Sequence, residues 1–381
     1  MLFLTNKRAF LVRLTAFTIV VFVSVSILEI TARLIIGLTE TLRPFPHIAK
    51  MVNGTVSFDA YEMASEIYTY HWSLKPGSFE KCVKSNDEIR EDFCFDIDVN
   101  SDGYRGANIP HQPSGTRILA IGDSVTFGLS DIDFPSELER LLPNGGGNVK
   151  VINAGVEGYR TRNALLEFNR HKRVKADYVI LFIGWNDIFA VPPGNGLFDF
   201  FLIDDAFRYI AIRAKQFISG KWQEAKQIAD RVATDETDAD EKQFAPIIYE
   251  PVFFQQIELL TQAHVANGSC VVIVTLPGLF VDHQNPGGKA KRMGHLPRYT
   301  EHYSVLASLT KIYNRHLKSL EEKLSNVVVF DAAEWSINAL HPRDQNFSDS
   351  VHMSKDGLQK ISAFFASQFD GNSRLVSSAC S

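Results

Sequence analysis

The chain has 381 residues, of which 45% are hydrophobic and 22% charged, and its formal net charge is -5. This composition is typical of a globular protein with a full core, arranged as one large domain or two ordinary ones. Because there is no basic excess, nucleic acid is excluded as an expected partner.

An apolar run near the N-terminus predicts a membrane anchor. Residues 14–28 carry no charge, and residues 9–28, which add only Arg13, approach the length of about 20 residues that spans a bilayer. Lys7, Arg8 and Arg13 are positive, and positive charge stays on the cytoplasmic side of the membrane. We therefore expect a single-pass protein whose remaining chain lies on the periplasmic or extracellular side.

A cleaved signal peptide is the alternative interpretation of the same run. Ser24 and Ser26 have the small side chains that a cleavage site needs, but both lie inside the apolar run. An uncleaved anchor is therefore favoured, and we assign residues 1–33 to a cytoplasmic tip and a signal-anchor helix.

Residues 34–112 are predicted to form a stem and an N-terminal extension. Pro44 and Pro46 would interrupt any helix after the anchor, and residues 57–112 show no clear period. Within them, residues 100–106 read NSDGYRG, a turn-rich stretch that leads into the main domain.

The four cysteines give little indication of a metal site. Cys82 and Cys94 are close in sequence, and they would form a disulfide only in an oxidising compartment. Cys270 opens an apolar run and is predicted to be buried, whereas Cys380 lies near the C-terminus. No CxxC or Cys/His spacing indicates zinc, so we expect neither a metal nor a cofactor.

From residue 117 onward, short apolar runs alternate with helical stretches. The runs predict strands that are buried on both faces, at residues 118–121, 149–152, 178–183, 271–276 and 327–330. The stretches between them predict helices at residues 135–142, 162–171, 251–266 and 300–324, and a last helix from about Ser354 with Leu358, Ile361, Phe364 and Phe365 on one face. This alternation predicts a parallel sheet covered by helices on both sides.

The main domain is assigned to residues 113–371, with insertions at 188–250 and 277–299 and a tail at 372–381. Residues 189–207 are aromatic and either cap the site or pack, whereas the acidic run at 234–241 is typical of a solvated loop. Residues 277–299 are predicted to be a long loop. The 28 Phe residues favour aromatic core packing over an apolar groove.

Three polar or glycine positions follow the first three predicted strands. Ser124 follows the first strand, Gly155 the second and Asn186 the third. Because ligands gather at the carboxyl ends of parallel strands, these positions indicate an active site. Asp349 and His352 stand three residues apart near the C-terminus. A histidine that is oriented by a carboxylate can take the proton of a serine hydroxyl and so make the serine a nucleophile.

Each of these residues also has an ordinary structural interpretation. Ser124 is a plausible helix cap, Asn186 a turn residue, and Asp349 a cap for the last helix, with His352 as a solvated neighbour. The order of the residues and their placement at strand ends favour a function for the set. The GxSxG motif is absent around Ser124, which argues against an ordinary α/β-hydrolase.

The ordered set resembles the SGNH hydrolases, also called GDSL-type esterases. The resembling segments are GDS at 122–124, NAG with Gly155, GWND at 184–187 and DSVH at 349–352, and NSDGYRG resembles that of membrane-anchored bacterial members. The resemblance implies an α/β fold: a three-layer α/β/α sandwich, flavodoxin-like, with a mostly parallel five-stranded sheet. It also implies hydrolysis of carboxylic esters without a metal.

The resemblance further implies roles for individual residues. Ser124 would be the nucleophile, His352 the base and Asp349 its orienting carboxylate. The oxyanion hole would comprise the backbone N–H groups of Ser124 and Gly155 and the side-chain amide of Asn186. Trp185 is a candidate for lining the substrate pocket.

The expected function is that of a membrane-anchored serine esterase that works through an acyl-enzyme. Its extracytoplasmic location makes acyl esters of envelope or extracellular glycans or lipids the expected substrates. An O-acyltransferase that uses the same acyl-enzyme and a non-catalytic binding module remain open as alternatives.

Overall fold

The computed structural model describes most of the predicted main domain and part of the N-terminal extension. The described residues are 24, 27, 61–63, 72–83, 93–109, 115–142, 149–189, 252–281, 284, 286–297 and 302–369. The chain divides into two compact units, and all described residues except Ser24 and Ile27 belong to the unit formed by residues 47–64, 71–192 and 228–381.

Several predicted segments lie outside the described residues. They are the anchor run at 9–28 apart from Ser24 and Ile27, the stem at 34–56, the aromatic and acidic stretches between 190 and 250, and the tail at 372–381. None of the helices in the described part of the chain has both the length and the apolar character that crossing a bilayer requires.

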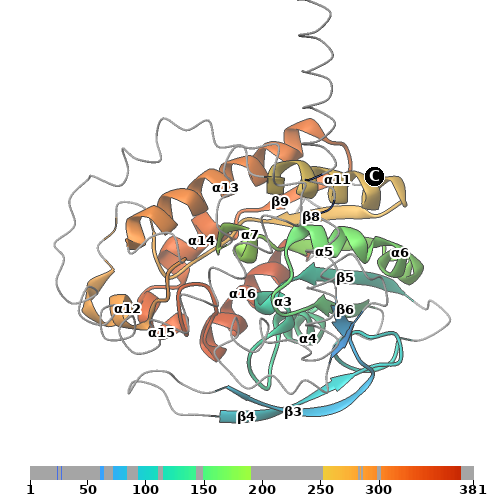
Figure 1. The fold of residues 1–381 in the computed structure, drawn as a ribbon, viewed down its shortest axis with the longest axis horizontal. Coiled ribbons are helices and arrows are strands. Elements are labelled where there is room, and N and C mark those ends of the chain that lie inside the picture. Colours follow the sequence, from blue (N-terminus) through green and yellow to red (C-terminus); the bar gives the residue numbers. More distant parts are fainter. Residues whose placement is uncertain are drawn as a thin grey trace, which may run out of the picture. The chain divides into compact units, whose positions relative to one another are not determined.

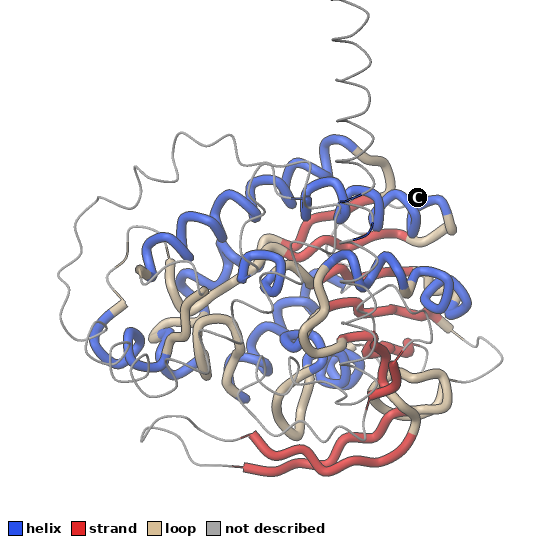
Figure 2. Tube along the Cα trace, viewed as in Figure 1, coloured by secondary structure: helices blue, strands red, loops and turns tan. Residues whose placement is uncertain are grey.

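A parallel sheet of five strands forms the centre of the unit (Figures 1 and 2). Its order is β6-β5-β7-β8-β9, and every neighbouring pair is parallel. The strands are β5 (Thr116–Gly122), β6 (Val149–Gly155), β7 (Tyr178–Phe182), β8 (Cys270–Val274) and β9 (Val327–Phe330). All residues of β8 are buried, as expected for a strand with helices on both faces. The predicted sheet and all of its strands are confirmed.

The direction of the crossovers places the helices in two outer layers. The chain moves one way from β5 to β6 and then back through β7, β8 and β9. Because such crossovers are right-handed, the helix between β5 and β6 covers one face and the later crossover helices cover the other. These helices are α4 (Phe134–Leu141) on the first face, and α5 (Thr161–Leu166), α6 (Phe168–His171), α11 (Val252–Ala266) and α13 (Tyr303–Lys323) on the second.

The last helix, α16 (Lys355–Phe369), packs against α4 and completes the first layer, whereas α11 packs against α5 and α13 (Figure 1). The shorter helical elements are α3 (Ser124–Phe127), a 3-10 turn (Lys172–Val174), α7 (Trp185–Phe189), α12 (Gly287–Met293), α14 (Ala332–Ala339) and α15 (Arg343–Asn346). The arrangement confirms the predicted sandwich of helix, sheet and helix.

Aromatic rings hold α4 and α16 against the sheet. Phe365 lies with its ring centre 5.2 Å from that of Phe134, 6.1 Å from that of Phe182 and 6.0 Å from that of Phe330. All four rings are buried. The Phe residues in this layer therefore pack in the core, as the composition favoured.

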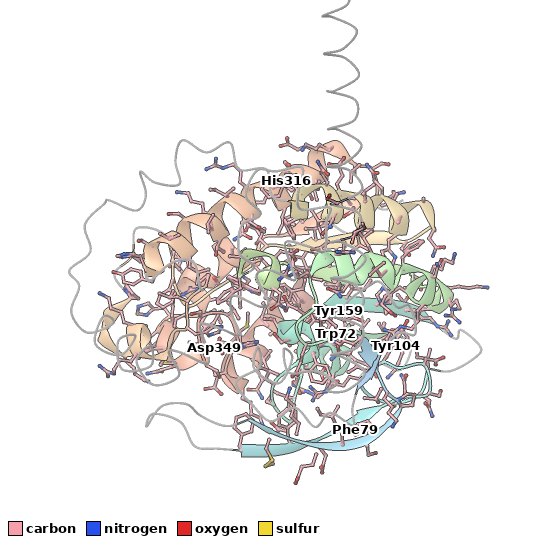
Figure 3. All side chains as sticks on the ribbon, viewed as in Figure 1. Trp72, Phe79, Tyr104, Tyr159, His316 and Asp349 are labelled. Carbon is pink, nitrogen blue, oxygen red and sulfur yellow. A yellow bond between two sulfur atoms is a disulfide. The ribbon has the colours of Figure 1, made fainter. Side chains whose placement is uncertain are left out.

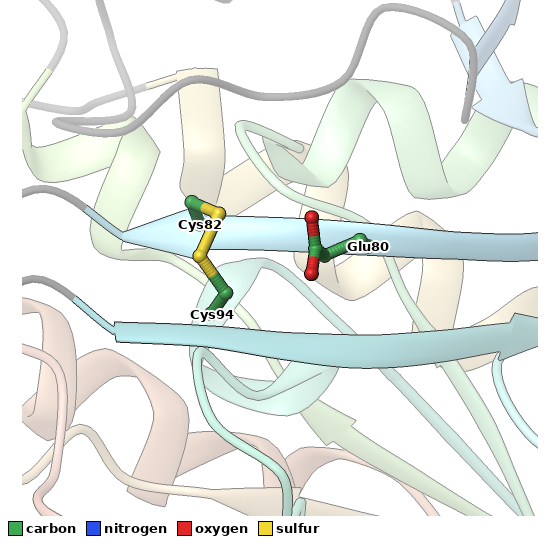
Figure 4. Close-up of side chains that lie close together, drawn as sticks. All are labelled: Glu80, Cys82 and Cys94. Atoms are coloured by element: carbon green, nitrogen blue, oxygen red, sulfur yellow. A yellow bond between two sulfur atoms is a disulfide. The ribbon is translucent and has the colours of Figure 1, made fainter.

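The N-terminal extension forms two antiparallel hairpins that the sequence analysis missed. They pair β1 (Tyr61–Met63) with β2 (Trp72–Leu74), and β3 (Gly77–Val83) with β4 (Phe93–Val99). The strand β3 was missed because a lysine, Lys81, occupies a buried position where the alternating pattern of a strand would have an apolar residue. Cys82 and Cys94 stand opposite each other and form a disulfide, which confirms that hypothesis (Figure 4).

The NSDGYRG turn connects this second hairpin to the edge of the sheet. Arg105 bridges Val99 at the end of β4 and Asn153 in β6. The Asn100 side chain accepts the N–H groups of Asp102 and Tyr104, each at 3.0 Å, and so closes the turn. The extension from β3 onward is thereby hydrogen-bonded to β6.

The prediction of an unbroken loop at 277–299 is wrong, because α12 lies within it. The helix begins with two glycines and has no extended apolar period, which hid it from sequence analysis. Ala290 and Met293, three residues apart, form its buried face.

Candidate active site

Ser124 is placed by the sharp turn between β5 and α3. Asp123 is the N-cap of α3, and its Oδ1 accepts the Val125 N–H at 2.9 Å. The alternative that Ser124 serves as the helix cap is therefore wrong. Ser124 occupies the first helical position, where backbone N–H groups are unpaired within the helix and favour an anion.

The structure brings Ser124, His352 and Asp349 into one hydrogen-bonded chain. Ser124 Oγ lies 2.7 Å from His352 Nε2, and His352 Nδ1 lies 2.7 Å from Asp349 Oδ2. A proton on Nδ1 satisfies both contacts, since Nδ1–H then donates to the carboxylate and Nε2 accepts from the hydroxyl. This is the arrangement in which a histidine acts as a base toward serine.

A tight loop between α15 and α16 fixes the acid and the base. Asp349 Oδ1 accepts the N–H groups of Val351 at 2.9 Å and His352 at 2.8 Å. Phe347 and Met353 form a β-bridge that closes the loop. Ser354 Oγ accepts the Gly357 N–H at 3.3 Å in the first turn of α16, so Asp349 is not the cap of that helix.

The two groups shift each other's protonation. Burial alone would raise the pKa of Asp349, but the charges of His352 and His295 and the hydrogen bonds from His352 hold it well below its usual range. Burial would lower the pKa of His352, but the charge and hydrogen bond of Asp349 raise it above its ordinary value. The pair therefore favours a carboxylate beside an imidazole that readily accepts a proton.

Two further carboxyl groups hold the loops around the site. Burial raises the pKa of Asp123 to about 6, and it raises the pKa of Asp187 to about 6 as well. Asp187 Oδ2 accepts the Thr161 N–H at 3.0 Å and the Thr161 hydroxyl at 3.1 Å, which ties α7 to α5. Neither carboxyl is hydrogen-bonded to the Ser124 hydroxyl, so both act by holding the loops in place.

Asn186 lies in the first turn of α7, which follows β7 at the carboxyl edge of the sheet. Its Nδ2 donates to the Tyr159 carbonyl at 2.9 Å. Within the described ranges, no residue accepts the second N–H of this amide. The Asn186 side chain is thus oriented by one hydrogen bond and keeps one donor for a substrate.

The predicted oxyanion role of Gly155 is contradicted by its contacts. The Gly155 N–H donates to Asn153 Oδ1 at 2.9 Å, and the residue is buried. A Cβ at this position would collide with the backbone of Phe127. Gly155 is therefore needed for close packing of β6 against α3, and its N–H is already committed.

Gly158, three residues later, has the properties that Gly155 lacks. It is half-buried, its φ is +77°, and no described residue accepts its N–H. The next residue, Tyr159, receives the hydrogen bond from Asn186. The second glycine of NAGVEG was the available signal in the sequence, but the first one follows the strand directly and was chosen instead.

Trp185 and Arg105 both have packing roles. Trp185 is buried, and a Cβ on Gly278 would lie 2.8 Å from its ring, so this side chain packs instead of lining an open pocket. Arg105 donates to the carbonyls of Phe127 and Gly128, both at 2.7 Å. It thereby holds the C-terminal end of α3 and not the substrate.

Sequence reasoning missed a second imidazole next to the acid. His295 Nδ1 lies 3.9 Å from Asp349 Oδ1, and the centres of the His295 and His352 rings are 6.4 Å apart. The Ser350 hydroxyl donates to the His295 carbonyl, which holds the two loops together. His295 lies in the inserted segment 277–299 outside any motif, so no sequence signal pointed to it.

One group of potential metal ligands occurs among the described residues. It comprises Glu80, Cys82 and Cys94 in the β3–β4 hairpin. Both sulfurs are joined in the disulfide and are not thiolates, so the group does not have the donors of a metal site (Figure 4).

Comparisons with known proteins identify the family. The sequence model of the GDSL-like Lipase/Acylhydrolase family matches residues 120–360, more than half of the chain. Among solved structures, the chain is similar to Axe2, an acetylxylan esterase from Geobacillus stearothermophilus, with 15% identity and a TM-score of 0.41 over 68% of this chain and 97% of that one. It is also similar to the acetyl xylan esterase AlAXEase, with 16% identity and a TM-score of 0.40 over 66% and 99% of the two chains.

A third similar structure is LAE5, an alpha/beta hydrolase enzyme from the metagenome of Lake Arreo, Spain, with 16% identity and a TM-score of 0.39 over 67% and 95% of the two chains. A search of the curated proteins found no match. The family match spans Ser124, Asn186, Asp349 and His352. The chain therefore belongs to the GDSL-like lipase/acylhydrolase family and is a hydrolase that acts on ester bonds.

Proposed function

We propose that the protein is a serine esterase that cleaves carboxylic esters through an acyl-enzyme on Ser124. The observation that carries this proposal is the pair of 2.7 Å contacts that join Ser124, His352 and Asp349. His352 Nε2 takes the Ser124 proton as Oγ bonds to the carbonyl carbon. The tetrahedral intermediate collapses, and His352 returns the proton to the departing alcohol. Water then repeats the sequence, releases the acid and restores Ser124.

The oxyanion hole of this reaction comprises the N–H groups of Ser124 and Gly158 and Nδ2 of Asn186. Gly158 replaces Gly155 because the Gly155 N–H already donates to Asn153. No described residue accepts the Ser124 N–H or the Gly158 N–H, so both are left for a substrate oxygen. Donors that are held in place before the reaction stabilise the developing charge without reorganisation.

The substrates of this esterase are acyl esters of envelope or extracellular glycans or lipids. The apolar run at 9–28 with its preceding positive charges supports an anchored, extracytoplasmic enzyme. The Cys82–Cys94 disulfide supports the same location, because disulfides persist in oxidising compartments.

Active-site labelling tests the proposed nucleophile. A fluorophosphonate probe should label the wild-type protein and leave Ser124→Ala unlabelled, with both variants melting at similar temperatures. A folded wild-type protein that the probe does not label would reject the serine mechanism and support a binding module.

Product analysis tests the substrate class. Acetate released from O-acetylated polysaccharide, and none from the same polymer after alkaline deacetylation, is the expected result. Transfer of the acetyl group to a glycan acceptor without net acetate release would replace the esterase proposal by an acyltransferase.

Fractionation of membranes from cells that express the full chain tests the anchor, and release of the protein in a soluble form would contradict it.

A further inference from the structure

A lysine from the N-terminal hairpin lies among the catalytic loops. Lys81, in β3, is 3% exposed, and its ammonium group forms an ion pair with the carboxylate of Glu157, which is 0% exposed. Lys81 Nζ also lies 5.3 Å from the centre of the Phe127 ring in α3. Burying two charges costs solvation free energy, and the attraction between them offsets this cost only when their geometry is good. The ion pair is therefore weak evidence for a role in stability alone.

Glu157 belongs to the loop that follows β6, directly before Gly158. The loop begins at Val156, whose N–H donates to the Gly122 carbonyl at 3.1 Å. Lys81 holds the Glu157 side chain from the hairpin, as described above. The pair therefore acts one residue away from the N–H that we assign to the oxyanion hole.

Trp72, in the other hairpin, contacts the same loop on both sides of Gly158. Trp72 Nε1 donates to the Glu157 carbonyl at 3.1 Å, and the Tyr159 hydroxyl donates to the Trp72 carbonyl. The side chains of Trp72 and Tyr159, both labelled in Figure 3, have ring centres 5.5 Å apart and meet edge to face. A Cβ on Gly158 would lie 3.2 Å from the Trp72 ring. The N-terminal extension therefore covers the outside of the loop.

We propose that Lys81 is a positioning residue for ester hydrolysis: through Glu157 it fixes the loop that presents the Gly158 N–H to the oxyanion. This inference rests on the proposed esterase function of the same site. Lys81 does not touch the reacting atoms, and its effect passes through the loop and through its charge. The two hairpins of the extension thus support the loop that carries Gly158.

The charge of Lys81 supplies a second link to the site. It lowers the pKa of His352, in opposition to the charges of Asp349 and Asp123, which raise it. His295 is a further titratable side chain that faces this acid–base pair. Burial, followed by the charge of Arg105, lowers the pKa of Lys81 itself to about 7. Lys81 is therefore charged below about pH 7.

The test compares Lys81→Met, Lys81→Arg and a control, Lys150→Met. Lys150 lies in β6, at the end opposite the site, and pairs with Glu139 at 3.0 Å. With p-nitrophenyl acetate, we expect Lys81→Met to lower kcat by about 10- to 100-fold, because small displacements of catalytic groups have effects of this size. KM should change by less than about 2-fold, and Lys81→Arg should restore most of kcat.

The pH profile separates positioning from a merely structural role. In Lys81→Met, the acid limb of kcat/KM should move to higher pH, because the charge that opposes protonation of His352 is gone. In Lys81→Arg and Lys150→Met, the acid limb should stay where it is in the wild type. A fall in kcat of equal size in Lys150→Met, or an acid limb that does not move in Lys81→Met, would overturn the inference.

Lys81→Met leaves the buried carboxylate of Glu157 without its partner charge, and this variant could therefore fail to fold. A double variant keeps the test decisive in that case. Lys81→Met/Glu157→Gln removes both charges of the pair, and it should show the same loss of kcat. Wild-type kcat in a folded double variant would overturn the inference. Failure of the wild type itself to turn over esters or to react with a fluorophosphonate would instead reject the proposed function.

Discussion

Replacing Asp349 by Asn should prevent His352 from acting as a base and leave the fold intact. Asp349 Oδ2 lies 2.7 Å from His352 Nδ1, whereas Oδ1 accepts two backbone N–H groups at 2.9 and 2.8 Å. The amide oxygen of Asn can keep the two backbone bonds, but its NH2 group then faces Nδ1 and can only donate. His352 is then held with its proton on Nε2, where it cannot accept the proton of Ser124.

The magnitude follows from the loss of the correct tautomer. An Asp-to-Asn change at this position of a Ser-His-Asp triad lowers kcat by about 10⁴-fold. Since each factor of ten corresponds to about 1.4 kcal/mol, the loss of transition-state stabilisation is about 5 to 6 kcal/mol. The pKa of His352 should also fall, because burial lowers it and the opposing charge of Asp349 is absent. The residual activity should therefore extend to lower pH than that of the wild type.

The assay is kcat for p-nitrophenyl acetate as a function of pH, with melting temperatures to verify folding. Asp344→Asn is the matched control, because Asp344 lies in the neighbouring α15 and pairs with Lys289 at 3.4 Å on the surface. Its kcat should stay close to that of the wild type. A value of kcat for Asp349→Asn within tenfold of the wild type, or an acid limb displaced to higher pH, would refute the assigned role of this carboxylate.

Three further outcomes are expected elsewhere in the structure. Asn186→Ala should lower kcat by about 10²- to 10³-fold with little change in KM, because its free N–H acts in the transition state, and an unchanged kcat would remove it from the oxyanion hole. Burial lowers the pKa of His264 to about 4 from 6.5, so the contribution of the neutral imidazole to stability is complete above about pH 6.5 and declines by up to about 3 kcal/mol as the pH falls toward 4. His264→Phe should abolish this part of the acid sensitivity in urea titrations, and equal pH dependence in the two proteins would contradict the assignment. Phe365→Ala should lower the free energy of unfolding by about 3 to 5 kcal/mol, because its fully buried ring contacts Phe134 and Phe182, and a loss below about 1 kcal/mol would show that the core refills the space.

Much of the fold follows from local patterns that sequence displays directly. Each predicted strand is an apolar run, and the predicted strand at 327–330 coincides with β9. Ser124 and Asn186 were found because polar residues that follow buried parallel strands meet at one edge. Asp349 and His352 were found because a short loop carries both of them.

The oxyanion glycine illustrates what local patterns do not reveal. Gly155 and Gly158 lie in one loop, and both are compatible with a turn after β6. Only the packing of β6 against Phe127 and the hydrogen bond to Asn153 show that the first glycine has no N–H to offer. These contacts depend on how closely β6 and α3 approach each other, and no short sequence motif reveals that distance.

By itself, the sequence determined the order of the strands along the chain, the helices between them and the three side chains of the hydrogen-bonded chain Ser124–His352–Asp349. Each of these has a short-range or edge-of-sheet signal. Tertiary structure alone decided that the hairpins of the N-terminal extension reach the site, that Lys81 is buried beside Glu157, and that His295 faces Asp349. The physical reason is that burial of a charge and commitment of a hydrogen bond are properties of contacts between segments far apart in the chain. A periodic pattern records which face of an element is apolar, but not which partner covers it.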